Sequence, residues 1–275
     1  MTSDDRTFEI RRFGAEEATK MTAISADVGW NQPEEEIEEI IARSGKYLVG
    51  AFHGGELVGT AAAYPYPDGN FAYVNEVIVL SSHRKRGAAT ALLKALLPLA
   101  SADYPVLRLC ATAMGRPIYE KFGFEPFAVL SFGELAYEAP EPAAEGVLPL
   151  TESDLPEACL LDAANFGAKR PEVLEKLFAA APDAAWKLVR GGRMAGFIVR
   201  ASMNWFLQCR DAETFTALIG FADSRVRGVP VLIREEHVKY LPAPIEEHFK
   251  LTLMQYGDAL PAPKAAFSGF LPDIG

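Results

Sequence analysis

The chain contains few of the residues that bind metals or build disulfide frameworks. Among its 275 residues there are 3 cysteines and 4 histidines. Cys110, Cys159 and Cys209 lie far apart in apolar surroundings, and the histidines have neither metal-ligand spacing nor a cysteine nearby. We therefore expect no metal site, and three free thiols as in a cytoplasmic protein.

Long apolar runs and an excess of positive charge are also missing. No run of about 18 apolar residues occurs, so we expect no transmembrane helix, and the first residues are too polar and acidic for a secretory signal peptide. The net charge of −10 argues against a nucleic-acid partner and favours a cationic substrate such as an amine. With 49% hydrophobic residues the chain can bury two moderate cores.

The most informative segment joins a predicted strand to a predicted helix. Residues 77–80 are apolar, and the apolar positions in 91–97 recur at helical spacing. Between them lies the basic, small-residue turn Arg84-Lys85-Arg86-Gly87-Ala88-Ala89-Thr90. The first N–H groups of a helix lack internal partners and face the positive end of its dipole, so they bind phosphate well. The turn therefore predicts a diphosphate site, with a solvated basic surface as the alternative.

The turn matches neither a Walker loop nor a three-glycine dinucleotide motif. It resembles the acetyl-CoA loop of the GNAT N-acetyltransferase superfamily, Gln/Arg-x-x-Gly-x-Gly/Ala, and the order of the neighbouring segments agrees. A hairpin is predicted from 47–52 and 57–64 around Gly54-Gly55, and a further strand from 106–110. The segment 116–124 then contains Tyr119 and closes with Gly123-Phe124, the second landmark of the family.

The resemblance implies an α/β (α+β) GNAT fold, with a mixed central sheet flanked by helices and acetyl-CoA as co-substrate. It implies that main-chain groups of Val77, Ile78 and Val79 lie along the pantetheine arm. One of their N–H groups would polarise the thioester oxygen. The cofactor's phosphates would contact the turn, that is Arg84, Lys85, Arg86, Gly87, Ala88, Ala89 and Thr90.

The resemblance also suggests two catalytic residues. Tyr119 occupies the position of the family's tyrosine, whose hydroxyl protonates the leaving thiolate; the alternative is a tyrosine packed beside Phe122 and Phe124. Glu76, on the strand beside the cofactor arm, is the candidate base, acting directly or through a water. An exposed edge charge or an arginine partner is the alternative for Glu76.

The sequence also repeats itself weakly. A shift of 137 residues aligns Gly54-Gly55-Glu56-Leu57-Val58-Gly59 with Gly191-Gly192-Arg193-Met194-Ala195-Gly196. The stretch 139–146 has the composition of a linker. We therefore predict a GNAT domain at 6–138 and a degenerate GNAT-like domain at 147–275. The second domain is shorter where the phosphate loop would be, and Asp211 would cap its helix instead.

Two functions follow as hypotheses. The first is an N-acetyltransferase that moves an acetyl group from acetyl-CoA to a primary amine of a small molecule or protein, by direct attack in a ternary complex. The second is a non-catalytic acyl-CoA-binding regulatory module. The sequence carries no readable code for the acceptor, and it leaves open whether the chain forms a homodimer.

Overall fold

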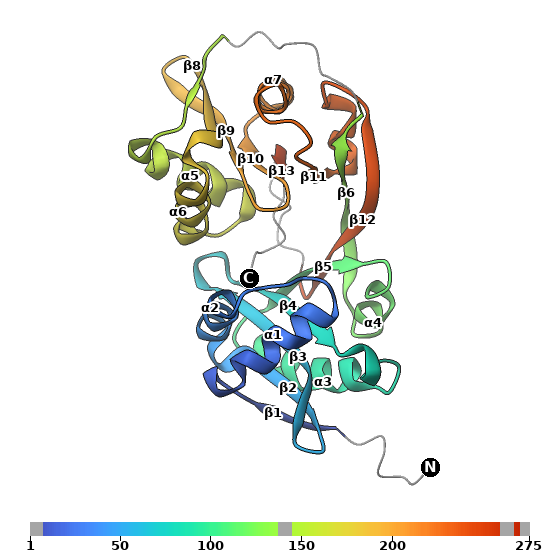
Figure 1. Cartoon of the computed structure of the whole chain (residues 1–275). Helices are drawn as coiled ribbons and strands as arrows, with labels where there is room; N and C mark the ends of the chain where they lie inside the picture. The colour runs from blue at the N-terminus through green and yellow to red at the C-terminus, as the bar shows by residue number, and fades with distance from the viewer. Residues whose placement is uncertain (1–7, 137–144, 259–266, 270–275) are drawn as a thin grey trace.

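The computed structural model describes residues 8–136, 145–258 and 267–269. The chain forms two lobes connected by two long strands (Figure 1). We call residues 8–124 the N-lobe and residues 145–244, with 267–269, the C-lobe. In the described part of the chain, no helix is long and apolar enough to cross a membrane.

The N-lobe contains five strands and four α-helices around one end of the sheet. In chain order they are β1 (Glu9–Arg12), α1 (Ala18–Asp27), α2 (Glu34–Ser44), β2 (Leu48–His53), β3 (Glu56–Tyr66), β4 (Phe71–Val79), α3 (Ala88–Ser101), β5 (Val106–Thr112) and α4 (Arg116–Lys121). The predicted hairpin is present as β2 and β3, and the predicted strand, loop and helix as β4, 80–87 and α3.

The C-lobe follows the same order of elements. It contains β7 (Val147–Pro149), α5 (Leu155–Phe166), α6 (Pro171–Ala180), β8 (Ala185–Arg190), β9 (Arg193–Arg200), β10 (Trp205–Cys209), α7 (Ala212–Arg225), β11 (Val231–Arg234) and β13 (Phe267–Gly269). A 3-10 helix, η8 (Glu235–Tyr240), follows β11 where α4 follows β5 in the N-lobe.

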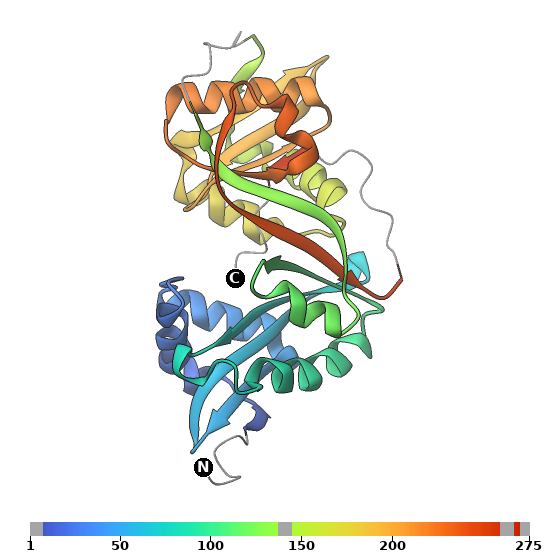
Figure 2. The ribbon, with the colours of Figure 1, turned by 90° about the vertical axis from the view of Figure 1, so that its right-hand side faces the viewer.

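The two long strands β6 (Glu125–Leu135) and β12 (Ile245–Tyr256) unite the lobes in one 13-stranded sheet. Its order is β1-β2-β3-β4-β5-β12-β6-β11-β13-β10-β9-β8-β7. Thus β12, which follows the C-lobe in the chain, pairs with β5 of the N-lobe, while β6 pairs with β11 of the C-lobe. Figure 2 shows the two strands twisting together from one lobe to the other.

Glycine accounts for the tight hairpins at the start of each lobe's sheet. Gly54 and Gly55 have φ of +59° and +83°, and Gly191 and Gly192 have +56° and +74°. Residues with a Cβ rarely adopt such angles, so two consecutive glycines between two apolar strands predict a two-residue turn. Both turns are found at the expected positions.

Each lobe packs helices on both faces of its part of the sheet. In the N-lobe, α3 and Tyr119 cover one face, and the isoleucines of α1 and α2 cover the other. Phe166 at the end of α5 joins that second core, where its ring lies 4.9 Å from Tyr66 and 5.6 Å from Phe71. The lobes therefore share part of a core.

The predicted domain boundaries stay a prediction. Most of the predicted linker, 139–146, falls outside the described residues. The exchange of β6 and β12 was not anticipated, because pairing between strands more than 100 residues apart leaves no local pattern.

Candidate active site

The site begins where β4 and β5 separate. The two strands pair in parallel at only three positions, Phe71 with Val106, Ala72 with Leu107 and Tyr73 with Arg108. Beyond Tyr73 and Arg108 their described residues do not pair with each other, although β4 continues to pair with β3 and β5 with β12. The divergence leaves the facing edges of β4 and β5 unpaired, and we call the region between these two edges the slot. An extended ligand can pair with such an edge as an added strand would.

A β-bulge at Glu76 shapes the β4 side of this slot. Thr60 pairs with Ile78 and Ala62 with Asn75, so Glu76 and Val77 together oppose Ala61. Glu76 has a φ of +50°, unusual for a residue with a side chain. Bulges of this kind often redirect side chains beside active sites.

The direction of the backbone amides refines the predicted cofactor contacts. The Leu80 N–H donates to the Val58 carbonyl on β3, with an N···O distance of 2.9 Å. Because these directions alternate along a strand, Ile78 also faces β3, whereas Val77 and Val79 face the slot. Of the three predicted residues, Val77 and Val79 are therefore the ones whose N–H groups can meet a ligand.

The loop 80–87 ends in an uncapped helix terminus. Gly87 is the N-cap of α3, with a φ of +95°, and no side chain accepts a hydrogen bond from the first turn. A Cβ built on Gly87 would meet nothing within 4 Å. The first turn contains only Ala88, Ala89 and Thr90, so its backbone is approachable. This is the geometry of an anion site at a helix N-terminus.

The basic residues of the loop take different positions. Arg84 turns back, and its Nε donates to the Val79 carbonyl at 3.1 Å. Arg86 lies over the ring of Phe8, with 5.7 Å between its Cζ and the ring centroid. Lys85, with a φ of +59°, is exposed. All three remain within one turn of the helix start, so their charge adds to the positive end of the dipole.

Glu76 is a buried carboxyl group that the Gln32 side-chain amide connects to the partly exposed carboxyl group of Glu36. The Glu76 side chain accepts a hydrogen bond from Gln32 Nε2 at 3.4 Å, and the same nitrogen donates to Glu36 at 3.2 Å. Glu76 is 4% exposed, and its Oε2 has no hydrogen-bond partner in the described part of the chain. Burial raises the pKa of Glu76 to about 7, and Glu36 acts in the same direction. In the described part of the chain, Glu76 is neither an exposed edge charge nor hydrogen-bonded to an arginine.

Tyr119 lies on the other side of the slot. Its ring packs edge-on against Phe124, with centroids 6.0 Å apart, as the packing alternative expected. Burial raises the pKa of the Tyr119 hydroxyl above its usual range, and the nearby Cys110 thiol adds to the effect. Cys110 belongs to the part of β5 beyond Arg108, so Tyr119 lies beside the β5 edge of the slot.

The structure thus gathers the predicted residues around one feature. Glu76, Val77 and Val79 lie on the β4 edge, Tyr119 beside the β5 edge and the loop at one end. Sequence reasoning missed Gln32 and Asn75. Both polar side-chain atoms of Asn75 are buried without a hydrogen-bond partner in the described residues, one position before the bulge. Nothing in the local sequence distinguishes these two amides from ordinary surface residues.

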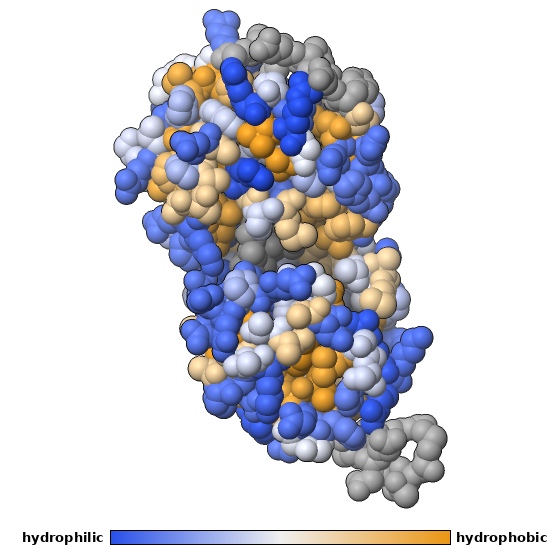
Figure 3. All heavy atoms as spheres, viewed as in Figure 1, coloured by the Kyte–Doolittle hydropathy of each residue, from blue (hydrophilic) through white to orange (hydrophobic). Residues whose placement is uncertain are grey.

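One part of the N-lobe surface is more hydrophobic than its surroundings. On the face shown in Figure 3, hydrophobic side chains gather over α3 and the neighbouring strand ends, with hydrophilic residues around them. Of the cysteines, Cys209 is buried and Cys110 and Cys159 are partly exposed, and none of the three forms a disulfide in the described part of the chain.

The corresponding position in the C-lobe is filled by the chain itself. β10 and β11 pair in parallel at one position, Trp205 with Val231. The strand β13 then lies between them, antiparallel to both. At the start of α7 the Asp211 side chain accepts the Thr214 N–H at 2.8 Å, as predicted. In the C-lobe, therefore, β13 occupies the space between the two strands, and the N-terminus of α7 is capped by Asp211.

Comparison with known proteins agrees with this geometry. Residues 15–124 match the model of the acetyltransferase (GNAT) family. The chain is 20% identical over 191 residues to YitH of Bacillus subtilis, named an uncharacterized N-acetyltransferase, covering 69% of this chain and 67% of the relative.

Solved structures extend the likeness in fold to the whole chain. A putative acetyltransferase from Pyrococcus horikoshii is similar with a TM-score of 0.76 and 20% identity, covering 98% of this chain and 96% of that one. A GCN5-related N-acetyltransferase from Kribbella flavida gives a TM-score of 0.62 at 15% identity, over 90% of this chain and 70% of that one. Residues 15–124, which carry the slot, the loop and Tyr119, thus match the acetyltransferase (GNAT) family, and the whole chain shares its fold with solved acetyltransferase structures.

Proposed function

We propose that the protein transfers an acetyl group from acetyl-CoA to a primary amine. The observation that carries this proposal is the uncapped N-terminus of α3 at the end of an open slot between β4 and β5. The diphosphate of acetyl-CoA needs a free helix N-terminus, and its extended, amide-containing arm needs an unpaired strand edge next to that terminus.

The residues present fit acetyl-CoA. The diphosphate would take the free N–H groups at Ala88, Ala89 and Thr90, where Gly87 leaves room and three basic side chains are near. The pantetheine arm would run along the unpaired edge of β4. The Val77 or Val79 N–H would then donate to the thioester oxygen and polarise the carbonyl.

Glu76 is suited to accept the proton of the attacking amine. A base works best when its pKa lies near the working pH, and burial has raised that of Glu76 to about 7. Its unpartnered Oε2 is the atom that an ammonium group, or a water between them, would meet. As the amine nitrogen bonds to the acetyl carbon and the carbon–sulfur bond breaks, one proton passes from nitrogen to Glu76.

Tyr119 is suited to complete the reaction by giving a proton to the departing sulfur. Its raised pKa keeps the phenol protonated at neutral pH, so that the proton is available. Transfer is direct, because the only cysteine near the slot in the described residues, Cys110, is a poor nucleophile. Burial raises the pKa of Cys110 to about 12, which leaves almost no thiolate at pH 7.

In this proposal the C-lobe supports the structure of the N-lobe and supplies no catalytic residue. We interpret it as a GNAT-like domain that has lost its cofactor site, since it repeats the order of elements but fills its own slot with β13. It contacts the N-lobe in two ways. Phe166 packs in the core of the N-lobe, and the Lys169 N–H donates a hydrogen bond to the Asp68 side chain with an N···O distance of 2.9 Å.

A thiol-release assay tests the function. Purified protein, acetyl-CoA and a panel of primary amines should release free CoA at a rate that depends on the amine, above slow hydrolysis. Calorimetry with CoA alone separates the non-catalytic alternative, because a regulatory module would bind CoA and turn over none of the amines. Absence of CoA binding would contradict both functions.

A further inference from the structure

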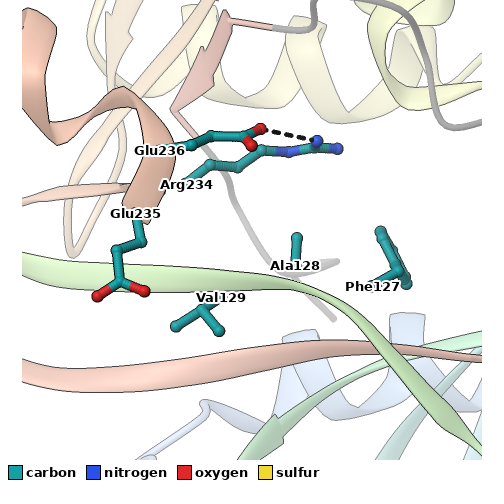
Figure 4. A pocket seen from close by; sticks show the side chains of 6 residues that line it. All are labelled: Phe127, Ala128, Val129, Arg234, Glu235 and Glu236. Carbon is teal, nitrogen blue, oxygen red and sulfur yellow. Dashed lines mark hydrogen bonds and ion pairs between the residues drawn. The ribbon is translucent and has the colours of Figure 1, made fainter.

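A hollow lies between the lobes, close to the slot. It has a volume of about 360 Å³. Its lining comes from β6, from the last residue of β11 and from the start of η8, namely Phe127, Ala128, Val129, Arg234, Glu235 and Glu236 (Figure 4). The C-lobe thus supplies three of the six lining residues, and the connecting strand β6 supplies the other three.

Arg234 reaches across this hollow, and its carboxylate partner there, Glu236, is largely exposed. In Figure 4 the Arg234 side chain extends above Ala128 toward Phe127. The side chain is 12% exposed, and its Nε is buried without a hydrogen-bond partner in the described residues. Its ion pair with Glu236 has an Nη1···Oε1 distance of 3.4 Å, to a carboxylate that is 64% exposed. An exposed pair of this length offsets little of the cost of burying the guanidinium.

Arg108 brings a second guanidinium to the same place. It is 8% exposed and lies 5.9 Å from the ring centroid of Phe127. Its hydrogen bonds go to neutral oxygens, Gln255 Oε1 at 3.2 Å and the Phe166 carbonyl at 3.5 Å. Burial lowers the pKa of Arg108, and the positive charge of Arg234 also lowers it, so the two cations are within electrostatic reach of each other.

Two buried cations that repel one another are stabilised by an anion between them. Arginine binds carboxylate and phosphate well because its planar fork donates two parallel hydrogen bonds. The unused Arg234 Nε is one such donor. Phe127 adds an apolar wall, since it is the extra residue of a bulge in β6: Ala128 pairs with Leu253 and Pro126 with Met254.

Arg108 is the arginine that lies near the reacting centre. Arg108 pairs with Tyr73 at the point where the slot opens. Its side chain lies on the α1 and α2 face, over the ring of Phe71, with 4.8 Å between its Cζ and the ring centroid. Glu76 meets Gln32 on that same face and lies three residues along β4 from Tyr73. At about 3.3 Å per residue, the backbone positions of Arg108 and Glu76 are on the order of 10 Å apart along the strands, and Arg234 lies farther away on β11.

We propose that the acceptor amine carries an anionic group, a carboxylate or a phosphate, which Arg108 and Arg234 hold while the amine faces Glu76. This inference rests on the proposed acetyl transfer. It assigns the C-lobe a part in choosing the substrate through Arg234.

Matched acceptors test this inference. The panel pairs ω-amino acids of three to six carbons with the ω-amino alcohols of the same lengths, and O-phosphoethanolamine with ethanolamine. We expect kcat/KM to be at least tenfold higher for at least one anionic amine than for its neutral partner, and higher salt should reduce the difference. The carboxylate and phosphate arms identify which anion is preferred.

Variants connect the preference to the hollow. Arg234→Gln should abolish the difference between anionic and neutral amines while leaving the neutral ones nearly unchanged, and Arg234→Lys should restore part of it. The control is Arg193→Gln, an exposed arginine at the start of β9, which should keep the full preference. Equal rates for anionic and neutral partners, or a preference that survives Arg234→Gln, would overturn the inference.

A binding measurement keeps the two proposals separable. Calorimetry of CoA-saturated protein with the ω-amino acids and O-phosphoethanolamine should detect binding that is lost in Arg234→Gln. If no amine turns over, the proposed function fails, and this measurement still decides whether the arginines form an anion site. Equal affinity of wild type and Arg234→Gln, or no binding to either, would mean that they do not.

Discussion

The two lobes have the same order of elements and differ in what occupies the space between their central strands. In the N-lobe β4 and β5 diverge after Tyr73 and Arg108 and leave a slot. In the C-lobe β10 and β11 diverge at once, and β13 fills the space. The difference teaches that this architecture creates an unsatisfied strand edge, which is paired either by a ligand or by the chain itself.

The helices that follow these strands, α3 and α7, also differ in what binds the N–H groups of their first turns. The loop before α3 spans residues 80–87, whereas only residues 210–211 separate β10 from α7. α3 begins at a glycine with nothing bonded to its first turn, and α7 at an aspartate that bonds to it. A carboxylate at this position takes the place of a bound phosphate, since both satisfy the same N–H groups.

The largest effect should come from Glu76, which lies at the bulge in β4. Glu76→Gln should lower kcat/KM about 1000-fold, because no base of suitable pKa remains. Wild-type kcat/KM should rise with pH through about 7, as the buried carboxyl loses its proton. This limb should be absent from the variant's pH–rate profile.

Stability provides the control for Glu76. Its folded pKa is raised from the ordinary 4.5, so its ionisation destabilises the fold as pH rises from about 4.5 to about 7. Glu76→Gln should therefore unfold at the same or a higher temperature than wild type at pH 8. A pH limb that persists in the variant would show that another group is the base.

Tyr119→Phe should follow, with kcat about 100-fold lower and the affinity for CoA unchanged. The ring would still pack on Phe124, so only the hydroxyl is lost. Tyr104→Phe, at a tyrosine that packs against Tyr47, is the matched control. Equal loss of turnover and of CoA binding would argue for a packing role instead.

Giving α3 the cap of α7 should weaken binding of CoA. Gly87→Asp places a carboxylate at the helix terminus, where space is open. We expect the Kd for CoA by calorimetry to rise about 30-fold more than in Gly87→Asn, corresponding to about 2 kcal/mol of repulsion. Asparagine tolerates the positive φ as aspartate does, so backbone strain is matched. Equal weakening in both variants would contradict a phosphate site at this turn.

The smallest effect should come from the C-lobe cap. Asp211→Ala should lower the free energy of unfolding by about 1 kcal/mol in urea titrations, because the Thr214 N–H loses its acceptor. Asp211→Asn keeps an acceptor oxygen and should lose less. Neither change should alter the affinity for CoA. A second CoA site appearing in Asp211→Ala would show that the cap alone, without β13, closes the C-lobe.

Much of the N-lobe could be predicted because its cues are local. The paired glycines fix two hairpins, apolar spacing marks α3, and the basic turn before Gly87 marks the loop. The same holds for Asp211, since an N-cap acts on an N–H three residues away. Residues that act through neighbours distant in sequence escaped notice. Gln32 matters because it donates a hydrogen bond to Glu76, 44 residues away. Arg234 matters because it lines a hollow with Phe127 and interacts electrostatically with Arg108.

The sequence by itself determined the local parts: which segments are strands or helices, where the turns fall and which helix terminus is free for an anion. These depend on backbone preferences and on residues within a few positions of each other. Only the tertiary structure decided that β6 and β12 exchange between the lobes, that β13 closes one slot, and that two arginines 126 positions apart come within electrostatic reach of each other. The physical reason is that strand edges pair, and buried charges interact, according to distance in space, which the order of the chain does not specify.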